Sequence, residues 1–225
     1  IDGNRGEVII NPIESVLTER REAQKTSESN YAALEIERTA EPITADGERI
    51  QLLGNIEFPT ETEHCLERGA EGIGLYRTEF LYLGVEQEPS EEDHYQAYCK
   101  VIEALGGREV VIRTLDLGAD KVPSAGGLPA ESTNPALGLR SIRLSLQYRE
   151  GFKTQLRAIL RAAAKAPPGS VKIMFPLISS LYEFRQAKMI VRDVMDDLDE
   201  AGESFPRDVP LGMMVEVPSA AILAD

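Results

Sequence analysis

Three charged residues stand directly after apolar runs that have the length and composition of buried strands. Arg77 follows GIGLY, Arg113 follows VVI, and Glu216 follows GMMV. An unpaired charge at the end of a buried strand is costly, so each side chain must be paired, hydrated or bound to a ligand. Because the carboxyl ends of parallel strands form the ligand face of α/β proteins, the two arginines predict a phosphate or carboxylate site. The glutamate would then hold a divalent metal that bridges to this anion.

A purely structural role remains open for the same residues. In that interpretation Glu216 makes a buried ion pair with one of the arginines, and Glu79 is a second possible partner. Two further cations are less distinctive. Lys121 lies in a charged loop after Arg113, and Arg140 lies where a helix is expected to open. Either side chain could reach an anion, but solvent-exposed basic residues are the more common case.

The elements that must position these charges alternate between strand and helix. Apolar runs predict strands over residues 50–56, 72–76, 109–115, 171–177 and 211–217. A serine or threonine followed three residues later by an acidic residue predicts helices that begin after residues 60, 90 and 180. Strands that are apolar throughout, separated by amphipathic helices, indicate an α/β fold with a parallel sheet. An open doubly wound sheet and an incomplete (β/α)8 barrel with about five of its eight units both fit this pattern.

The first 42 residues have a different character. Residues 1–12 read as a short hairpin, too small to be stable alone, and we interpret them as the tail of a domain that lies upstream. Residues 13–42 are polar and charged with few apolar positions, which predicts a solvated linker helix. Residues 43–225 then form the α/β domain.

Composition limits the possible partners. The chain of 225 residues has 38 Asp and Glu against 24 Lys and Arg, which disfavours nucleic acid and anionic membranes because both repel an acidic protein. No segment approaches the ~20 apolar residues of a membrane helix, so we expect a soluble, cytoplasmic protein. Cys65 and Cys99 are too few for a disulfide framework or a zinc quartet, which fits a reducing compartment. His64 and His94 are both expected on helix surfaces.

Several of these segments resemble the PEP-utilising enzymes, in the form found in Enzyme I of the sugar phosphotransferase system. The likeness spans nearly the whole chain in the family's order. It is carried by GIGLYRTEFL (72–81), VIRTLDLGADK (111–121), NPALGLRSIR (134–143), QLRAILR (155–161), IMFPL (173–177) and MVEVP (214–218). The opening GEVIINP (6–12) is similar to the end of that family's phosphohistidine domain, which identifies residues 1–12 as its remnant.

The resemblance implies a specific activity. Members of the family transfer phosphate from phosphoenolpyruvate (PEP) to a histidine of a mobile domain and on to a histidine-containing phosphocarrier protein, releasing pyruvate. Arg77 and Arg113 would bind the phosphate of PEP, and Arg140 and Lys121 would add positive charge around it. Glu216 would be one of two Mg²⁺ ligands. Family barrels commonly dimerise, so a homodimer is also expected.

Other family residues have no counterpart in this chain. These are the second Mg²⁺ ligand on the sixth strand, the arginine that grips the PEP carboxylate, the proton-donating cysteine and the upstream acceptor histidine. We therefore expect a piece of the enzyme with no turnover by itself. Two alternatives remain: a related PEP enzyme (pyruvate phosphate dikinase or PEP synthase), or a non-catalytic dimerisation module.

Overall fold

A computed structural model describes residues 1–3, 6–38, 40–85, 87–122 and 138–223. The chain divides into two compact units, Ile1–Ile50 and Gln51–Asp225, and each is described by itself. The second unit holds the sheet and all the charged residues singled out above.

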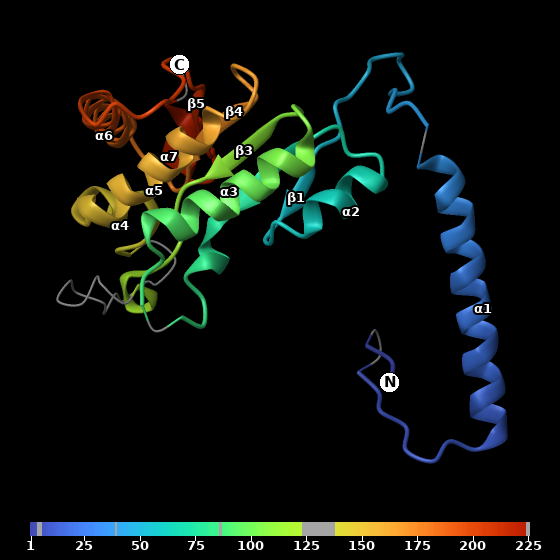
Figure 1. Cartoon of the computed structure of the whole chain (residues 1–225). Helices are drawn as coiled ribbons and strands as arrows, with labels where there is room; N and C mark the ends of the chain where they lie inside the picture. Colours follow the sequence, from blue (N-terminus) through green and yellow to red (C-terminus); the bar gives the residue numbers. More distant parts are fainter. Residues whose placement is uncertain (4–5, 39, 86, 123–137, 224–225) are drawn as a thin grey trace. The chain divides into compact units, whose positions relative to one another are not determined.

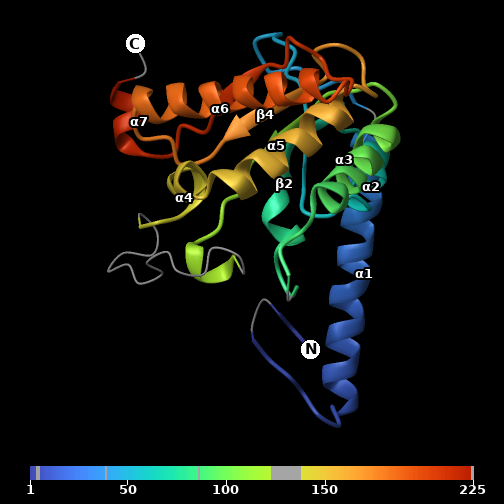
Figure 2. The ribbon, with the colours of Figure 1, turned by 60° about the vertical axis from the view of Figure 1, so that its left-hand side comes forward.

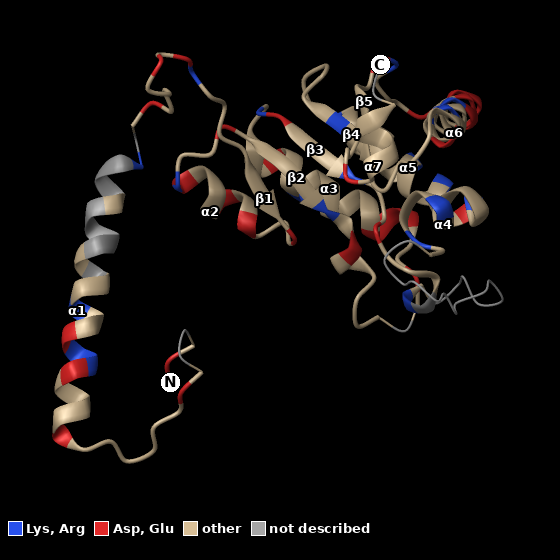
Figure 3. Cartoon of the chain, turned by 180° about the vertical axis from the view of Figure 1, so that it is seen from behind, with Lys and Arg blue, Asp and Glu red and all other residues tan. Residues whose placement is uncertain are grey.

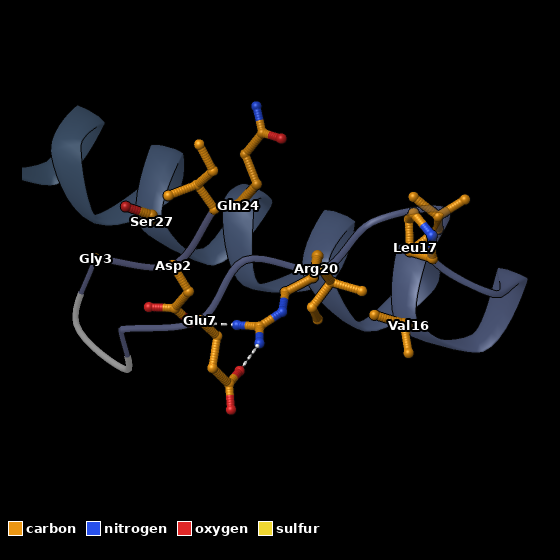
Figure 4. A pocket seen from close by; sticks show the side chains of 11 residues that line it. Asp2, Gly3, Glu7, Val16, Leu17, Arg20, Gln24 and Ser27 are labelled. Atoms are coloured by element: carbon orange, nitrogen blue, oxygen red, sulfur yellow. Dashed lines mark hydrogen bonds and ion pairs between the residues drawn. The ribbon is translucent and has the colours of Figure 1, made fainter.

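The N-terminal unit consists of a short paired segment and one long helix, α1 (Glu14–Glu37). The helix has no glycine or proline, so nothing in its sequence interrupts it. An isolated antiparallel bridge joins Asp2 to Glu7, as the predicted hairpin requires, although its turn at residues 4–5 falls outside the described residues. The Arg20 guanidinium of α1 donates to the carboxylates of Asp2 and Glu7 beside a pocket (Figure 4). These ion pairs hold the segment against the helix.

The second unit contains a five-stranded parallel sheet in which neighbours in sequence are neighbours in space (Figure 1). The strands are β1 (Gly54–Ile56), β2 (Ile73–Arg77), β3 (Val110–Arg113), β4 (Val171–Phe175) and β5 (Leu211–Met213). All five predicted strands are confirmed. Four are shorter than their predicted runs, and β2 has the predicted length but is shifted by one residue to include Arg77. A doubly wound sheet reverses its strand order at a switch point, and this sheet does not. The order is that of part of a (β/α)8 barrel.

Helices connect the strands and pack along one face of the sheet (Figures 1 and 2). They are α2 (Glu61–Glu67), α3 (Glu91–Leu105), α4 (Ser141–Gln147), α5 (Arg149–Ala163), α6 (Leu181–Glu200) and α7 (Pro218–Ile222), with short 3₁₀ turns η1 (Thr78–Leu81) and η2 (Ala119–Lys121). Seen from behind, the strands lie in front of α3 and α5 (Figure 3). Right-handed crossovers that always step in one direction place every helix on the same side. None of the described helices combines the length and apolar character needed to cross a membrane.

The core fills the layer between the helices and the sheet. Along β4, Val171, Ile173 and Phe175 are buried against α5 and α6, whereas Lys172 and Met174 on the other face are partly exposed. This two-residue alternation is the burial pattern of a strand with one covered face. Each fully buried aliphatic or aromatic side chain stabilises the fold by about 1.5–3 kcal/mol.

Two of the three predicted helix starts have the expected capping box. Ser90 with Asp93 opens α3, and Ser180 with Glu183 opens α6. The box predicted at Thr60 is wrong, because its side chain accepts no hydrogen bond from the helix. The carboxylate of Glu61 takes over this role by accepting the backbone N–H groups that precede α2, at 2.7 and 2.9 Å.

The connections at the two ends of the sheet differ in chemistry. At the amino ends, helices give way to turns with positive φ, such as Gly106 (φ 56°) after α3 and Gly202 (φ 71°) after α6. Glycine adopts this conformation without steric cost, so these turns are short and tight. At the carboxyl ends, β2 and β3 finish in arginines, Glu57 follows β1, and Glu216 lies three residues after β5.

The expectation for the two histidines is half confirmed. His64 is exposed on α2, but His94 on α3 is fully buried, so its predicted surface position is wrong. Its spacing explains the burial, since it lies one turn before Tyr98 on the helix stripe that continues through Val101 and Leu105. Cys65 and Cys99 are partly buried on α2 and α3, and burial raises the pKa of the Cys65 thiol.

Candidate anion-binding site at the strand ends

The two arginines expected to bind an anion lie side by side. Arg77 and Arg113 are the last residues of β2 and β3, and their Cα atoms are register partners in the parallel ladder. Sequence reasoning placed both at strand ends, and the ladder adds that the two ends are level. Two guanidinium groups therefore start from adjacent points at one edge of the sheet.

Arg113 is held by contacts on both of its terminal nitrogens. Its Nη2 donates to Glu79 of η1, and its Nη1 lies 3.3 Å from Asp116 and 3.4 Å from the sulfur of Met214, just after β5. Only 8% of the Arg113 side chain is exposed. The buried ion pair considered as a structural alternative thus exists, but Glu79 pairs with Arg113 rather than with Arg77. A side chain with so many contacts has little freedom to turn.

Arg77 is held more loosely. Its Nη1 donates to Glu57, just after β1, at 2.9 Å, and 39% of its side chain is exposed. The chain from β1 to β3 therefore alternates carboxylate and guanidinium groups. An exposed ion pair contributes little to stability, so Arg77 is free to exchange its partner at small cost.

Arg140 joins the same group through Asp116. It is the N-cap residue of α4, and its Nη2 donates to Asp116 at 2.8 Å. Burial opposes ionisation of Asp116, but hydrogen bonds from Ser141 and Arg140 and the charge of Arg113 hold its pKa below the ordinary value. Asp116 therefore stays ionised and links two of the predicted site arginines.

Several buried polar atoms at these strand ends have no partner. In the described part of the chain, the unpaired buried side-chain atoms include four at the ends of β2 and β3. They are the Nε atoms of Arg77 and Arg113, Oε2 of Glu79 and Oγ1 of Thr114. Buried donors without acceptors are rare in proteins and call for an explanation, such as a ligand. Two guanidinium Nε–H groups without acceptors fit an anion that supplies oxygens.

Glu216 and Lys121 lie at the margin of this group. Glu216 is exposed three residues after β5, and its Oε1 accepts the backbone N–H of Leu177 at 2.7 Å. Leu177 has φ 56°, a strained value for a residue with a side chain. Across the described ranges, Glu216 makes no ion pair with an arginine, so that structural alternative is not found. Lys121 is exposed at the end of η2.

The described residues do not gather three side chains able to hold a metal ion. Glu216 offers one carboxylate at the ligand face. That fits Mg²⁺, which is commonly bound through one or two carboxylates together with waters and substrate phosphates. Within the described ranges this fit rests on the single carboxylate of Glu216.

The geometry of the arginines suits an anion through the direction of their N–H groups rather than through excess positive charge. Arg77, Arg113 and Arg140 each have a carboxylate partner, so the local charge is nearly balanced. Guanidinium groups fixed by such partners present their remaining N–H groups in a defined direction. This suits a small, highly charged group such as a phosphate.

Sequence reasoning missed several residues that surround the arginines. Glu57, Asp116, Thr78 and Gln155 were not singled out, although three of them fall within the quoted motifs. Gln155 gave a usable signal, because a polar residue occupies the stripe of α5 that is otherwise apolar. Residues 134–137 of the NPALGLRSIR motif lie outside the described residues.

Comparison with known proteins identifies the family. A family described as "PEP-utilising enzyme, PEP-binding domain" matches residues 31–225. Phosphoenolpyruvate-protein phosphotransferase of Staphylococcus carnosus (strain TM300) is 45% identical over 225 residues, covering 100% of this chain and 39% of that protein. Proteins of the same name from Priestia megaterium and Bacillus sp. (strain S) are 44% and 46% identical and are covered to 39% and 38%. The chain thus spans less than two fifths of these relatives.

Proposed function

The chain belongs to the PEP-binding domain family of the PEP-utilising enzymes, and we propose that its strand ends bind the phosphate of PEP through Arg77 and Arg113. One observation carries the proposal. The two arginines are register partners on adjacent strands, and each has a buried Nε–H without an acceptor. Phosphate oxygens are suitable acceptors for both groups.

Other residues extend this proposed site. Arg140, linked through Asp116, and Lys121, on η2, would add positive charge around the phosphate. Glu216 would hold Mg²⁺. When bound, the metal neutralises the charge that develops on a transferring phosphoryl group. The protein's own part is to fix the direction of the arginine donors before the ligand arrives.

The wider activity follows from the names of the relatives. We propose that this chain is the PEP-binding part of a phosphotransferase that moves phosphate from PEP to an enzyme histidine and then to a histidine-containing phosphocarrier, releasing pyruvate. The relatives described above are named as protein phosphotransferases, which favours this reading over a dikinase or a synthase. The arginines at the strand ends support PEP binding. Neither histidine of this chain is placed as an acceptor at this site, since His94 is buried and His64 lies on α2.

Calorimetric titration with PEP in the presence of Mg²⁺ tests the proposed site. Arg77→Ala and Arg113→Ala should each weaken PEP binding about 10–100-fold, the loss typical of a charge-assisted hydrogen bond. Arg157→Ala is the matched control, because Arg157 pairs with Glu91 on the helix layer.

Two results would count against the proposal. Unchanged PEP affinity in both strand-end variants would place the ligand elsewhere, and a loss of equal size in Arg157→Ala would point to general destabilisation. Incubation with PEP, Mg²⁺ and phosphocarrier should yield no phosphorylated carrier, and phosphorylation by this chain would show that turnover needs fewer residues than proposed.

Self-association is the remaining part of the proposal. Among the described strands, β5 is paired only with β4, and Val215 and Leu223 beyond it are large exposed apolar residues. An unpaired strand edge favours association with another chain. Light scattering should therefore show dimers at high protein concentration, and a strictly monomeric chain would remove this part of the proposal.

A further inference from the structure

A buried glutamine lies directly behind the two proposed phosphate-binding strand ends. Gln155 on α5 is 1% exposed, and both ends of its amide are used. Its Oε1 accepts the backbone N–H of Leu115 at 3.0 Å. Its Nε2 donates to Thr78 Oγ1 at 2.9 Å and to the Tyr98 hydroxyl at 3.1 Å. One side chain therefore bridges a helix to two separate turns of the site.

These two turns are the ones that carry the arginines. Thr78 directly follows Arg77, and its hydroxyl donates to the backbone carbonyl of Arg113 at 2.8 Å. Leu115 comes two residues after Arg113. Thr78 and Gln155 thus hold the backbone directly after the Arg113 side chain, at the Arg113 carbonyl and at the N–H of Leu115, and they tie the end of β2 to the end of β3.

The hydrogen bonds continue away from the site in a single consistent direction. The Tyr98 hydroxyl lies 2.9 Å from His94 Nδ1, and His94 Nε2 lies 3.1 Å from the Tyr82 hydroxyl. Because Tyr98 accepts from Gln155, its own proton is available for Nδ1, and His94 then carries its proton on Nε2. Every member of this series is buried, so a partner lost from it cannot be replaced by solvent.

An apolar side chain would fill the position of Gln155 equally well if packing were its only role. Phe152, Leu156 and Ile159 on the same stripe of α5 do only that. Gln155 differs in satisfying the N–H of Leu115 and in fixing which way the Thr78 hydroxyl points. Since buried polar groups are costly without partners, its presence indicates a task in placing the backbone.

We propose that Gln155 and Thr78 are positioning residues that set the placement of the Arg77 and Arg113 guanidinium groups for phosphate. This inference rests on the proposed function for the phosphate itself. It goes further by assigning the geometry of the site to hydrogen bonds made from the helix layer, outside the ligand's reach. A small displacement of a binding group can cost about 100-fold, so the effect should be measurable.

A crossed pair of variants separates positioning from packing. Thr78→Val keeps the shape of the side chain but removes the hydroxyl, whereas Thr78→Ser keeps the hydroxyl but removes a methyl group. Gln155→Met is a second variant of similar shape without the amide. In each variant the backbone N–H of the buried Ile173, which donates to the carbonyl of Pro210, reports by hydrogen exchange that the sheet is folded.

A positioning role and a packing role predict opposite orders for the loss of PEP affinity among these variants. Thr78→Val and Gln155→Met should weaken PEP binding at least 10-fold, and Thr78→Ser should stay within about 3-fold of the unmodified chain. In Gln155→Met the N–H of Leu115 should also exchange faster while that of Ile173 stays protected. Equal losses in the serine and valine variants, or a larger loss in the serine variant, would overturn the proposal.

A readout without PEP keeps the two proposals apart. The Nε–H resonance of Arg113 in the ligand-free chain should shift in Thr78→Val and Gln155→Met and stay in place in Thr78→Ser. If the unmodified chain fails to bind PEP but this resonance responds as described, the phosphate assignment falls and the positioning of Arg113 stands. An Arg113 resonance that is unchanged in both polar-to-apolar variants overturns the positioning role.

Discussion

The carboxyl ends of β3 and β5 each carry a charged residue of the proposed site, but the two ends are built in different ways. At the end of β3, Arg113 is nearly fully buried, with two carboxylates and a sulfur atom around its terminal nitrogens. At the end of β5, Glu216 is exposed and its described contact is one backbone N–H. One end is fixed before any ligand binds, and the other is free to move.

This difference matches what we propose that each group recognises. A phosphate is small and directional, so donors that are already oriented bind it without further ordering. Magnesium keeps several waters and needs only one or two protein carboxylates, so an exposed glutamate can adjust to it. The desolvation cost of the two charges also differs, because the buried Arg113 must be paired, whereas the exposed Glu216 is hydrated without a partner.

The largest effect is expected from Glu79→Ala. This change leaves the buried Arg113 without its closest partner, and removing one member of a buried ion pair destabilises a protein by about 3–5 kcal/mol. The free energy of unfolding, measured with urea, gives the loss. Glu57→Ala is the matched control, because its pair with Arg77 is more than one-third exposed and should cost less than about 1 kcal/mol. Similar losses in the two variants would remove the contrast between fixed and loose arginines.

A pH titration tests the buried series behind β3. Burial lowers the pKa of His94 to about 4, against an ordinary value of 6.5, so only the unfolded chain takes up this proton between those values. Stability should be fully present above pH 6.5 and should fall by about 3 kcal/mol as the pH decreases to 4.

The two histidines of the chain provide a control for this titration. His94→Gln should flatten the pH dependence of the unfolding free energy relative to the unmodified chain. His64→Gln, which alters an exposed ring, should leave the slope as it was. A slope that survives in His94→Gln would show that carboxylates, and not this imidazole, cause the loss.

A smaller effect is expected at the link between Arg113 and Arg140. Asp116→Asn removes the charge of this link and should cost about 1.5 kcal/mol at neutral pH. Because the pKa of Asp116 is held below its ordinary 3.8, its contribution is present above that value and is lost as the pH falls further. The loss in unfolding free energy caused by Asp116→Asn should therefore become smaller in acid. Asp197→Asn, which alters an exposed pair with Lys153, is the control and should cause no such pH-dependent loss. A difference that is constant with pH would contradict the ionised link.

The smallest effect on stability is expected at β5. Glu216→Ala should change the free energy of unfolding by less than about 0.5 kcal/mol, since water can replace an exposed carboxylate. The same variant should lose the Mg²⁺ dependence of PEP binding in calorimetry. A large loss of stability would show that Glu216 holds the end of β4 in place, and retained Mg²⁺ dependence would move the metal to other residues.

The course of the sheet was readable from the sequence because its strands are continuous apolar runs. The sequence pattern alone could not distinguish a doubly wound sheet from a barrel, since both use the same alternation of strand and helix. That choice depends on strand order, which here runs without reversal from β1 to β5. The capping box at Thr60 was also not decided by its sequence pattern: the Thr60 side chain accepts no hydrogen bond from α2, and the carboxylate of Glu61 accepts the backbone N–H groups of Glu57 and Phe58.

The site was predictable in its cations and not in their surroundings. Arg77 and Arg113 stand out because charge directly follows an apolar run. Asp116, by contrast, lies in a loop and becomes central only when α4 brings Arg140 to it. The burial of His94 was available from its spacing to Tyr98, but a lone polar residue on a helix was interpreted as exposed. Long-range pairs of this kind depend on the fold, and the local sequence contains no pattern that predicts them.

The glycine turns at the amino ends of the sheet have a practical consequence. The turn at residues 201–204 is exposed, and Gly202 closes it after α6. A five-residue strand such as β4 separates that end of the sheet from the charged end by about 16 Å. An affinity tag or a tether to a sensor chip inserted after Gly202 would immobilise the protein with its arginines facing the solution. Binding could then be followed on a surface without chemical labelling of Cys65 or Cys99.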